Sequence, residues 1–182
     1  GAGVEFRTLR RRVNGTVAEH AILLMLAVGR KLCETNGALD FATLNSLGYR
    51  PAKFDPDHVA GANWARIGGL RSLQGAVLGA LGLGEIGREV AIRAKAMGAE
   101  ILYYQRTRMP EEVERECGAR YVTFEEMLER SDFISIHLPL DDSTRGMIDG
   151  AAFDRMRQGA ILVNISRAHI VDRAALIAAL DG

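Results

Sequence analysis

Short apolar runs alternate along most of the chain with segments whose apolar residues recur at helical spacing. The runs predict five buried strands, at 76–81, 101–104, 120–122, 132–137 and 160–164. The remaining segments predict helices at 85–97, 110–118, 123–130, 143–148, 151–156 and 172–180. Alternating strands and helices are typical of an α/β fold whose parallel sheet is covered by helices on both faces. Right-handed crossovers then predict a doubly wound sheet with strand order 3-2-1-4-5.

The residues before this alternation follow a different pattern. Thr16 and Glu19 are spaced as a capping box, which predicts a helix over 16–31. Its centre, 21–28, is apolar on every side, so we expect it to be buried in a core or against another subunit. Residues 34–75 are rich in glycine and predict an irregular arm that wraps a surface or a partner. The arm carries four spaced aromatic side chains, Phe41, Tyr49, Phe54 and Trp64.

The sequence Gly82-Leu83-Gly84-Glu85-Ile86-Gly87 follows the first predicted strand and begins the helix predicted at 85–97, after which comes the second strand. Between a strand and a helix, Gly82 permits a tight turn, Gly84 lets the backbone approach a pyrophosphate, and Gly87 lets the helix pack closely. The free amides at the start of the helix would face the phosphates. The stretch therefore predicts a Rossmann-type domain that binds NAD or NADP. A glycine-rich turn without a ligand is the alternative.

The composition limits the partners of the chain. Its 182 residues carry 23 basic and 23 acidic side chains, so the formal charge is zero, which argues against nucleic acid and an anionic membrane surface as partners. The two cysteines have no metal-ligand spacing, and no metal site is predicted. The longest apolar stretch is far shorter than the ~20 residues that cross a bilayer. We therefore expect one dinucleotide-binding domain over 1–182, with its core at 76–180, in a cytoplasmic protein.

Three further motifs follow one another along the chain. They are Val17-Ala18-Glu19-His20, then His137-Leu138-Pro139-Leu140 with Thr144, and finally Asn164-Ile165-Ser166-Arg167 before Val171-Asp172. Together with the glycine turn, they make the chain similar to the coenzyme domain of the D-isomer-specific 2-hydroxyacid dehydrogenases. The resemblance implies an oxidoreductase that transfers a hydride between NAD(P)H and a small 2-keto or 2-hydroxy acid.

The resemblance also implies the site residues. Arg167 would be catalytic, because a guanidinium forms two hydrogen bonds to a carboxylate or a polarised carbonyl. The cofactor-binding residues would be Gly82, Gly84, Glu85, Ile86, Gly87, Gln105, Arg106, Thr107, Arg108, His137, Leu138, Pro139, Thr144, Ile165, Ser166 and Arg167. The family's catalytic histidine and glutamate, and most of its substrate domain, have no counterpart in 1–182. The chain alone is therefore expected to bind the dinucleotide without activity, and to form a homodimer through 16–75.

One departure from the family pattern bears on the cofactor. Gln105 stands where NAD-dependent members have an acidic residue, which repels a 2′-phosphate. The following Arg106, Thr107 and Arg108 offer two guanidinium groups and a hydroxyl to a phosphate dianion. The sequence therefore predicts that NADP is preferred over NAD. A solvated basic turn is the alternative.

A second departure follows the catalytic arginine. Ala168 and His169 stand where the family usually has one or two glycines, and a Cβ there predicts a strained turn or a narrower substrate pocket. This change favours a second hypothesis, a non-catalytic module of the same fold that senses NAD(H) and recruits partners. The presence of Arg167 favours the enzyme.

Overall fold

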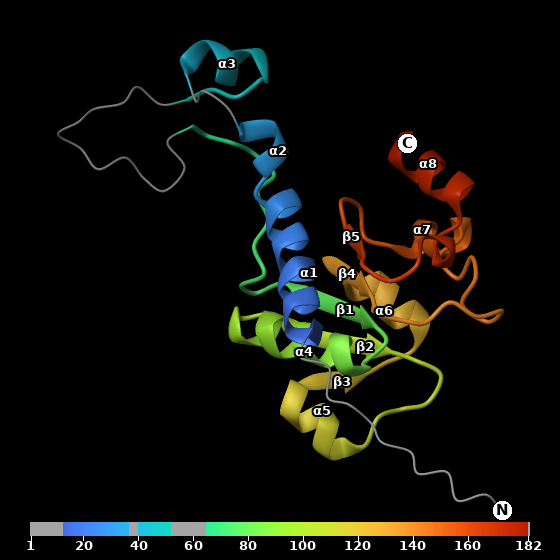
Figure 1. The fold of residues 1–182 in the computed structure, drawn as a ribbon. Coiled ribbons are helices and arrows are strands. Elements are labelled where there is room, and N and C mark those ends of the chain that lie inside the picture. Colours follow the sequence, from blue (N-terminus) through green and yellow to red (C-terminus); the bar gives the residue numbers. More distant parts are fainter. Residues whose placement is uncertain (1–12, 37–39, 52–64, 182) are drawn as a thin grey trace, which may run out of the picture.

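The computed structural model describes residues 13–36, 40–51 and 65–181. Within these ranges, five parallel strands form one sheet in the order β3-β2-β1-β4-β5 (Figure 1). The strands are β1 (Val77–Leu81), β2 (Glu100–Tyr104), β3 (Ala119–Tyr121), β4 (Phe133–Ile136) and β5 (Ile161–Asn164). The predicted strand order is therefore confirmed.

Helices cover both faces of this sheet. One face carries α1 (Val13–Gly29), α4 (Glu85–Ala96) and α5 (Glu111–Cys117). The other carries α6 (Phe124–Arg130) and α7 (Gly150–Arg155). The short 3-10 helix η1 (Ala168–Ile170) then leads into α8 (Arg173–Asp181), which packs against α7. This arrangement confirms a doubly wound α/β fold.

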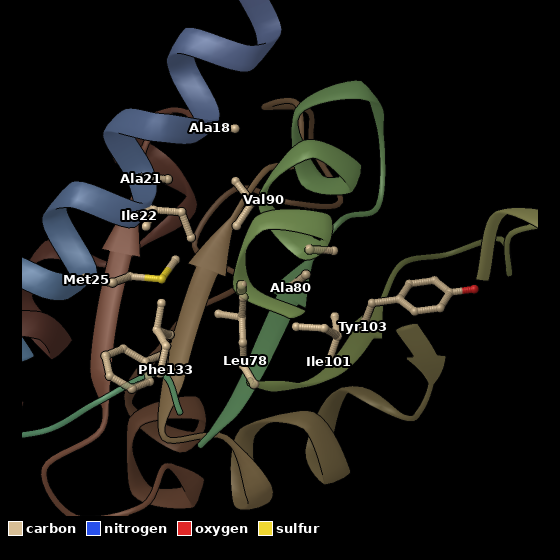
Figure 2. Close-up of a cluster of buried hydrophobic side chains, with 14 of the residues drawn as sticks. Ala18, Ala21, Ile22, Met25, Leu78, Ala80, Val90, Ile101, Tyr103 and Phe133 are labelled. Carbon is tan, nitrogen blue, oxygen red and sulfur yellow. The ribbon is translucent and has the colours of Figure 1, made fainter. Parts of the chain in front are cut away.

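The larger of the two cores lies between the sheet and the pair α1 and α4. Ala18, Ala21 and Met25 of α1 have no exposed surface. Figure 2 shows side chains of α1 pointing toward the sheet, where Met25 lies near Phe133. Burial of a large apolar side chain contributes roughly 1.5–3 kcal/mol. Because both faces of the strands are covered, their sequences form continuous apolar runs rather than alternating ones.

The first helix begins earlier than the sequence predicts. Among the described residues α1 starts at Val13, so Thr16 lies inside the helix and the predicted capping box is wrong. Contact with α4 accounts for the extra residues, since the Asn14 amide donates a hydrogen bond of 2.7 Å to Glu85. The helix ends at Gly29 rather than Lys31, which has a left-handed φ of 54°.

A short helix α2 (Leu32–Thr35) crosses the start of the irregular arm predicted at 34–75, and a second, α3 (Phe41–Ser46), lies within it. At the start of α3 the Asp40 carboxylate accepts a hydrogen bond of 2.7 Å from the Thr43 amide. This side-chain cap explains how a helix forms in a segment without an apolar period. The expectations for Phe54 and Trp64 lie outside the described residues.

Residues 142–146 form turns, and the helix predicted at 143–148 is absent from the structure. The Asp141 carboxylate accepts hydrogen bonds from the amides of Ser143 and Thr144, at 2.9 and 3.1 Å. Such local bonds compete with helix formation. The segment then ends in a parallel bridge between Ile148 and Val171.

Other predicted helix ends are confirmed. Thr123 accepts a hydrogen bond from the Glu126 amide at the start of α6, and Asp172 accepts one from the Ala175 amide before α8. Gly118 ends α5 with a φ of 61°. Within the described residues, no helix has the length and apolar character that crossing a membrane requires.

Candidate dinucleotide-binding site

The predicted site residues all lie where strands end at one edge of the sheet. Because the strands are parallel, their carboxyl ends meet there. The segments leaving this edge are the glycine turn (82–87) after β1, the loop 105–109 after β2, the segment 137–144 after β4 and the turn 165–167 after β5. The fold thus brings together residues that are far apart in the sequence.

The glycine turn has the geometry that its spacing predicts. Gly82 has a φ of 100°, and a Cβ there would lie 2.9 Å from the Leu138 side chain. A Cβ on Gly87 would overlap the carbonyl oxygen of Gly82. A Cβ on Gly84, in contrast, would meet nothing within 4 Å. The space in front of Gly84 is therefore open to the close approach of a ligand.

The amino end of α4 suits an anion. Gly84 is its N-cap and supplies no side-chain hydrogen bond, so the first amides are left to bind an external group at the positive end of the helix dipole. The carboxylate of Glu85 is tied to Asn14 of α1 by a hydrogen bond of 2.7 Å. The open space at Gly84 and the uncapped amides together fit a pyrophosphate.

Gln105 connects the glycine turn to the loop after β2. Its side-chain oxygen accepts a hydrogen bond of 2.8 Å from the Leu83 amide, and its Nε2 donates one of 2.6 Å to the Thr107 carbonyl. The exposed side chain of Arg106 forms no hydrogen bond or ion pair within the described part of the chain. Gln105 therefore links the two segments, while Arg106 has no partner within the described part of the chain.

Arg108 is bound within the domain. Its Nε and Nη2 each donate a hydrogen bond of 2.8 Å to Glu114 on α5. Glu114 also accepts one of 2.6 Å from the Tyr103 hydroxyl, and these bonds from Arg108 and Tyr103 lower the pKa of Glu114 to about 2. Burial and the bond to Glu114 raise the pKa of Tyr103 to about 12. The expectation that both arginines of the loop are available to a phosphate is therefore corrected.

A pocket of about 350 Å³ opens between the segments that follow β2 and β4. It is lined by Tyr104, Gln105, Arg106, Thr107, Leu138, Pro139, Asp141, Ser143, Thr144 and Met147. Apolar walls and a few polar groups are typical of small-ligand pockets. Its size and its position beside the glycine turn suit an adenosine group.

Thr144 shapes the wall of this pocket. Its hydroxyl donates a hydrogen bond of 2.7 Å to the Pro139 carbonyl and accepts one of 2.9 Å from the Asp141 amide. These two bonds close the segment 139–144 into a compact loop. Thr144 is nearly buried, so its hydroxyl acts within the protein.

His137 lies behind the glycine turn and does not line the pocket. Its Cδ2 lies 3.5 Å from the point that a Cβ on Gly87 would occupy. Both ring nitrogens are buried and have no hydrogen-bond partner among the described residues. Burial lowers the pKa of His137 to about 4, so the ring is neutral at pH 7 and supports the turn by packing.

Arg167 lies on an exposed turn after β5, and Asn164 fixes that turn. The Asn164 amide donates a hydrogen bond of 3.0 Å to the Arg167 carbonyl, and its oxygen accepts one of 2.9 Å from Ser166. The Ser166 hydroxyl donates to the Leu138 carbonyl, which joins this turn to the segment after β4. The Arg167 guanidinium donates a hydrogen bond of 3.2 Å to the Ser166 carbonyl and has no acidic partner within the described residues.

The turn after Arg167 accommodates side chains without a left-handed residue. Ala168 and His169 begin η1, whose preceding residue Arg167 has a φ of −127°. Among the described non-glycine residues, positive φ occurs at Lys31 and Arg66. The expectation of a strained turn is therefore wrong, because the 3-10 conformation does not require glycine. The predicted narrowing of the substrate pocket stays a prediction.

Comparison with known proteins identifies the domain. Residues 48–182 match the model of the D-isomer specific 2-hydroxyacid dehydrogenase family, NAD binding domain. The chain belongs to this family. The predicted resemblance and the prediction of a nicotinamide dinucleotide cofactor are confirmed.

Among its relatives, this dehydrogenase domain is 41% identical over 165 residues to the glyoxylate reductase of Thermococcus litoralis, covering 90% of the chain and 45% of the relative. It is 48% identical over 111 residues to 4-methyl-2-oxopentanoate reductase A of Aspergillus oryzae, a match that covers 61% of the chain and 33% of that relative. The chain thus spans less than half of the length of these relatives.

Solved structures of the family share the fold of this domain. A glyoxylate reductase from Paecilomyes thermophila has a TM-score of 0.72 at 34% identity and covers 93% of the chain and 45% of its own. The apo D-mandelate dehydrogenase of Rhodotorula graminis has a TM-score of 0.77 at 30% identity, with coverage of 94% and 47%. The shared fold extends over more than nine tenths of the chain.

Sequence reasoning missed four residues that line the pocket of the dehydrogenase domain, Tyr104, Asp141, Ser143 and Met147. The Asp141-Asp142-Ser143 sequence carries a signal for a side-chain turn that points to two of them. Tyr104 and Met147 join the pocket only through the tertiary fold. Within the described residues, no group of three or more potential metal ligands is present.

Proposed function

We propose that this chain is the coenzyme domain of an enzyme that transfers a hydride between NAD(P)H and a small 2-keto or 2-hydroxy acid. The glycine turn binds the pyrophosphate, and the pocket beside Gln105 and Leu138 holds the adenosine. Ile165 and Ser166 border the ribose of the nicotinamide. The bound nicotinamide supplies or accepts the hydride. The relatives named for glyoxylate and 4-methyl-2-oxopentanoate support short 2-keto acids as substrates.

Arg167 binds the substrate in this proposal. Its guanidinium donates two hydrogen bonds to the carboxylate of the acid and orients the neighbouring carbonyl carbon for hydride transfer. The hydrogen bonds of Asn164 hold the backbone on either side of Arg167, in a turn at the same edge of the sheet as the glycine turn. The observation that carries the proposal is a cation without an acidic partner among the described residues, on the turn after β5, at the same edge of the sheet as the open glycine turn.

Replacing Arg167 tests this role. In the full-length protein, Arg167→Ala should lower kcat/KM for glyoxylate more than tenfold, because a charge-assisted bond contributes about 1.5–3 kcal/mol, while the dissociation constant of the dinucleotide stays unchanged. Arg115→Ala, which removes an exposed arginine of α5, is the matched control. An equal loss of dinucleotide affinity in the Arg167 variant would contradict the assignment.

The second hypothesis, a module that senses NAD(H) without turnover, rests on Ala168 and His169 in place of the family's glycines. It predicts dinucleotide binding with no reduction of any 2-keto acid by the full-length protein. Steady-state assays with glyoxylate and 4-methyl-2-oxopentanoate separate the two hypotheses.

We also propose that NADP is preferred over NAD. Neutral Gln105 does not repel a 2′-phosphate, and exposed Arg106 and Thr107 lie on the rim of the pocket. Because Arg108 is held by Glu114, one guanidinium rather than two is available. One charge-assisted contact of about 1.4 kcal/mol corresponds to a tenfold preference.

Side-by-side titrations with NADPH and NADH measure this preference. Gln105→Glu keeps an oxygen for the Leu83 amide and adds a negative charge, so it should shift the preference toward NADH. Arg106→Ala should weaken NADPH binding about tenfold and leave NADH binding unchanged. A wild-type protein that favours NADH, or a glutamate variant with an unchanged ratio, would contradict the proposal.

A further inference from the structure

Three side chains beside the adenosine pocket form a network that the binding function does not explain. Tyr103 on β2, Arg108 on the following loop and Glu114 on α5 are joined by three hydrogen bonds of 2.6 to 2.8 Å. We name these three residues the clamp. Tyr103 is fully buried, and the Glu114 side chain is only 11% exposed. A poorly exposed carboxylate that receives three such bonds has a fixed geometry.

The clamp and Tyr121 fix the loop 105–109 at both ends. At one end the Tyr121 hydroxyl donates a hydrogen bond of 3.3 Å to the Gln105 carbonyl. At the other end the Met109 amide donates one of 2.9 Å to the Tyr103 oxygen. Arg108 also lies over the Tyr121 ring, 5.9 Å from its centre. The loop is therefore held in a conformation in which Arg108 does not take the place of Arg106 at the pocket.

The two arginines of this loop face different surroundings. Both side chains are exposed, Arg108 to 58%, but Arg106 lines the pocket, whereas Arg108 does not line it and is paired with Glu114. A forked ion pair with a poorly exposed carboxylate neutralises Arg108 and holds its guanidinium in place. At the pocket, the loop therefore presents one net positive charge.

We propose that Glu114 is a specificity-determining residue, because it withdraws Arg108 from the 2′-phosphate and leaves Arg106 as the one guanidinium that reads it. Arg108 is then a positioning residue for the loop. This inference rests on the proposed binding of NAD(P) and names the residues that set the discrimination between the two cofactors. It assigns phosphate recognition to Arg106 and loop positioning to Arg108, and variants of each residue measure the two roles separately.

The test compares the dissociation constants of NADPH and NADH, measured by fluorescence titration of the full-length protein. Arg108→Ala loosens the loop, so it should weaken both cofactors by the same factor and leave their ratio within about twofold. Arg108→Met, which keeps the apolar stem over Tyr121, should behave alike. Glu114→Gln keeps the shape and removes the charge that retains Arg108, so the ratio should move several-fold toward NADPH.

A double variant identifies the source of that gain. In Glu114→Gln/Arg108→Ala the ratio should return to the wild-type value, because the released guanidinium is gone. Glu112→Gln removes the same charge from an exposed position of α5 and should leave the ratio unchanged. Melting temperatures of the apo proteins show that each variant is folded.

The outcomes separate this inference from the proposed function. A selective loss of NADPH affinity in either Arg108 variant would show that Arg108 binds the phosphate, and would overturn the inference. An unchanged ratio in Glu114→Gln would also overturn it. Absence of dinucleotide binding in the wild type would instead contradict the proposed function.

Discussion

Burial determines the charge state of His137 beside the candidate dinucleotide-binding site. His137 belongs to a motif that in sequence indicates a cofactor contact, yet its ring lies behind the glycine turn with both nitrogens hidden from solvent. Transfer of a charged imidazolium to such a place is unfavourable, so burial lowers the pKa of His137 to about 4 from 6.5. The protonation of His137 is thus coupled to folding.

This coupling predicts how the stability of the domain depends on pH. Because the pKa of His137 is lower in the folded state than in the unfolded state, its contribution is complete above pH 6.5 and is lost as the pH falls toward 4. His137→Gln, which does not titrate, should flatten this part of the profile of unfolding free energy against pH. His169→Gln, at an exposed histidine, is the control. Equal slopes in wild type and His137→Gln would contradict the prediction.

At the scale of elements, one turn joins β1 to α4 and uses its glycines for different purposes. Gly87 lets α4 lie against the carbonyl of Gly82, whereas Gly84 keeps open the space in front of the helix. The first requirement concerns folding and the second concerns the ligand. Two residues of the same type in the same motif should therefore respond differently to the same substitution.

A pair of alanine variants makes this difference measurable. Gly87→Ala forces a Cβ onto the Gly82 carbonyl and should cost about 1–3 kcal/mol of unfolding free energy in a urea titration. Gly84→Ala has room and an allowed φ of −70°, so its stability should be unchanged, while its affinity for dinucleotide falls more than tenfold. Each variant is the control of the other. Similar losses of stability in both would contradict the separation of roles.

For the whole molecule, the first helix leaves an apolar surface without a partner in the described structure. Leu23 and Val28 of α1 are 55% and 58% exposed, and Leu32 of α2 is 50% exposed. The sequence predicts a helix that is apolar on every side, and in the structure only one side of it packs on α4 and the sheet. A second copy of the chain would cover the other side through a two-fold contact.

We therefore expect a homodimer through the region 16–75. Leu23→Arg combined with Val28→Arg should convert the dimer into a folded monomer in sedimentation at micromolar concentration, because both charges would be buried in the interface. Ile177→Arg, on an exposed position of α8, should leave the dimer intact. A wild-type protein that sediments as a stable monomer would refute this arrangement.

Much of the fold follows from local patterns in the sequence. The apolar runs determine the strands, and right-handed crossovers determine the order β3-β2-β1-β4-β5. The spacing of Gly82, Gly84 and Gly87 determines the turn that fits a pyrophosphate, since only glycine permits the close contacts at Gly82 and Gly87, and Gly84 leaves the space in front of the helix open. Family motifs along the chain indicate the same site, at the edge where the parallel strands end.

Tertiary structure alone decided which of these side chains remain available. The sequence predicts that Arg106 and Arg108 are both available to a phosphate, but Glu114, on a separate helix, binds only Arg108. Helix α1 begins before the predicted cap, where Asn14 contacts Glu85. Asp141 binds the Ser143 amide, so a segment predicted as a helix forms turns that line the pocket. Pairing depends on distances between segments that are remote in the chain, and local propensity carries no information about such distances.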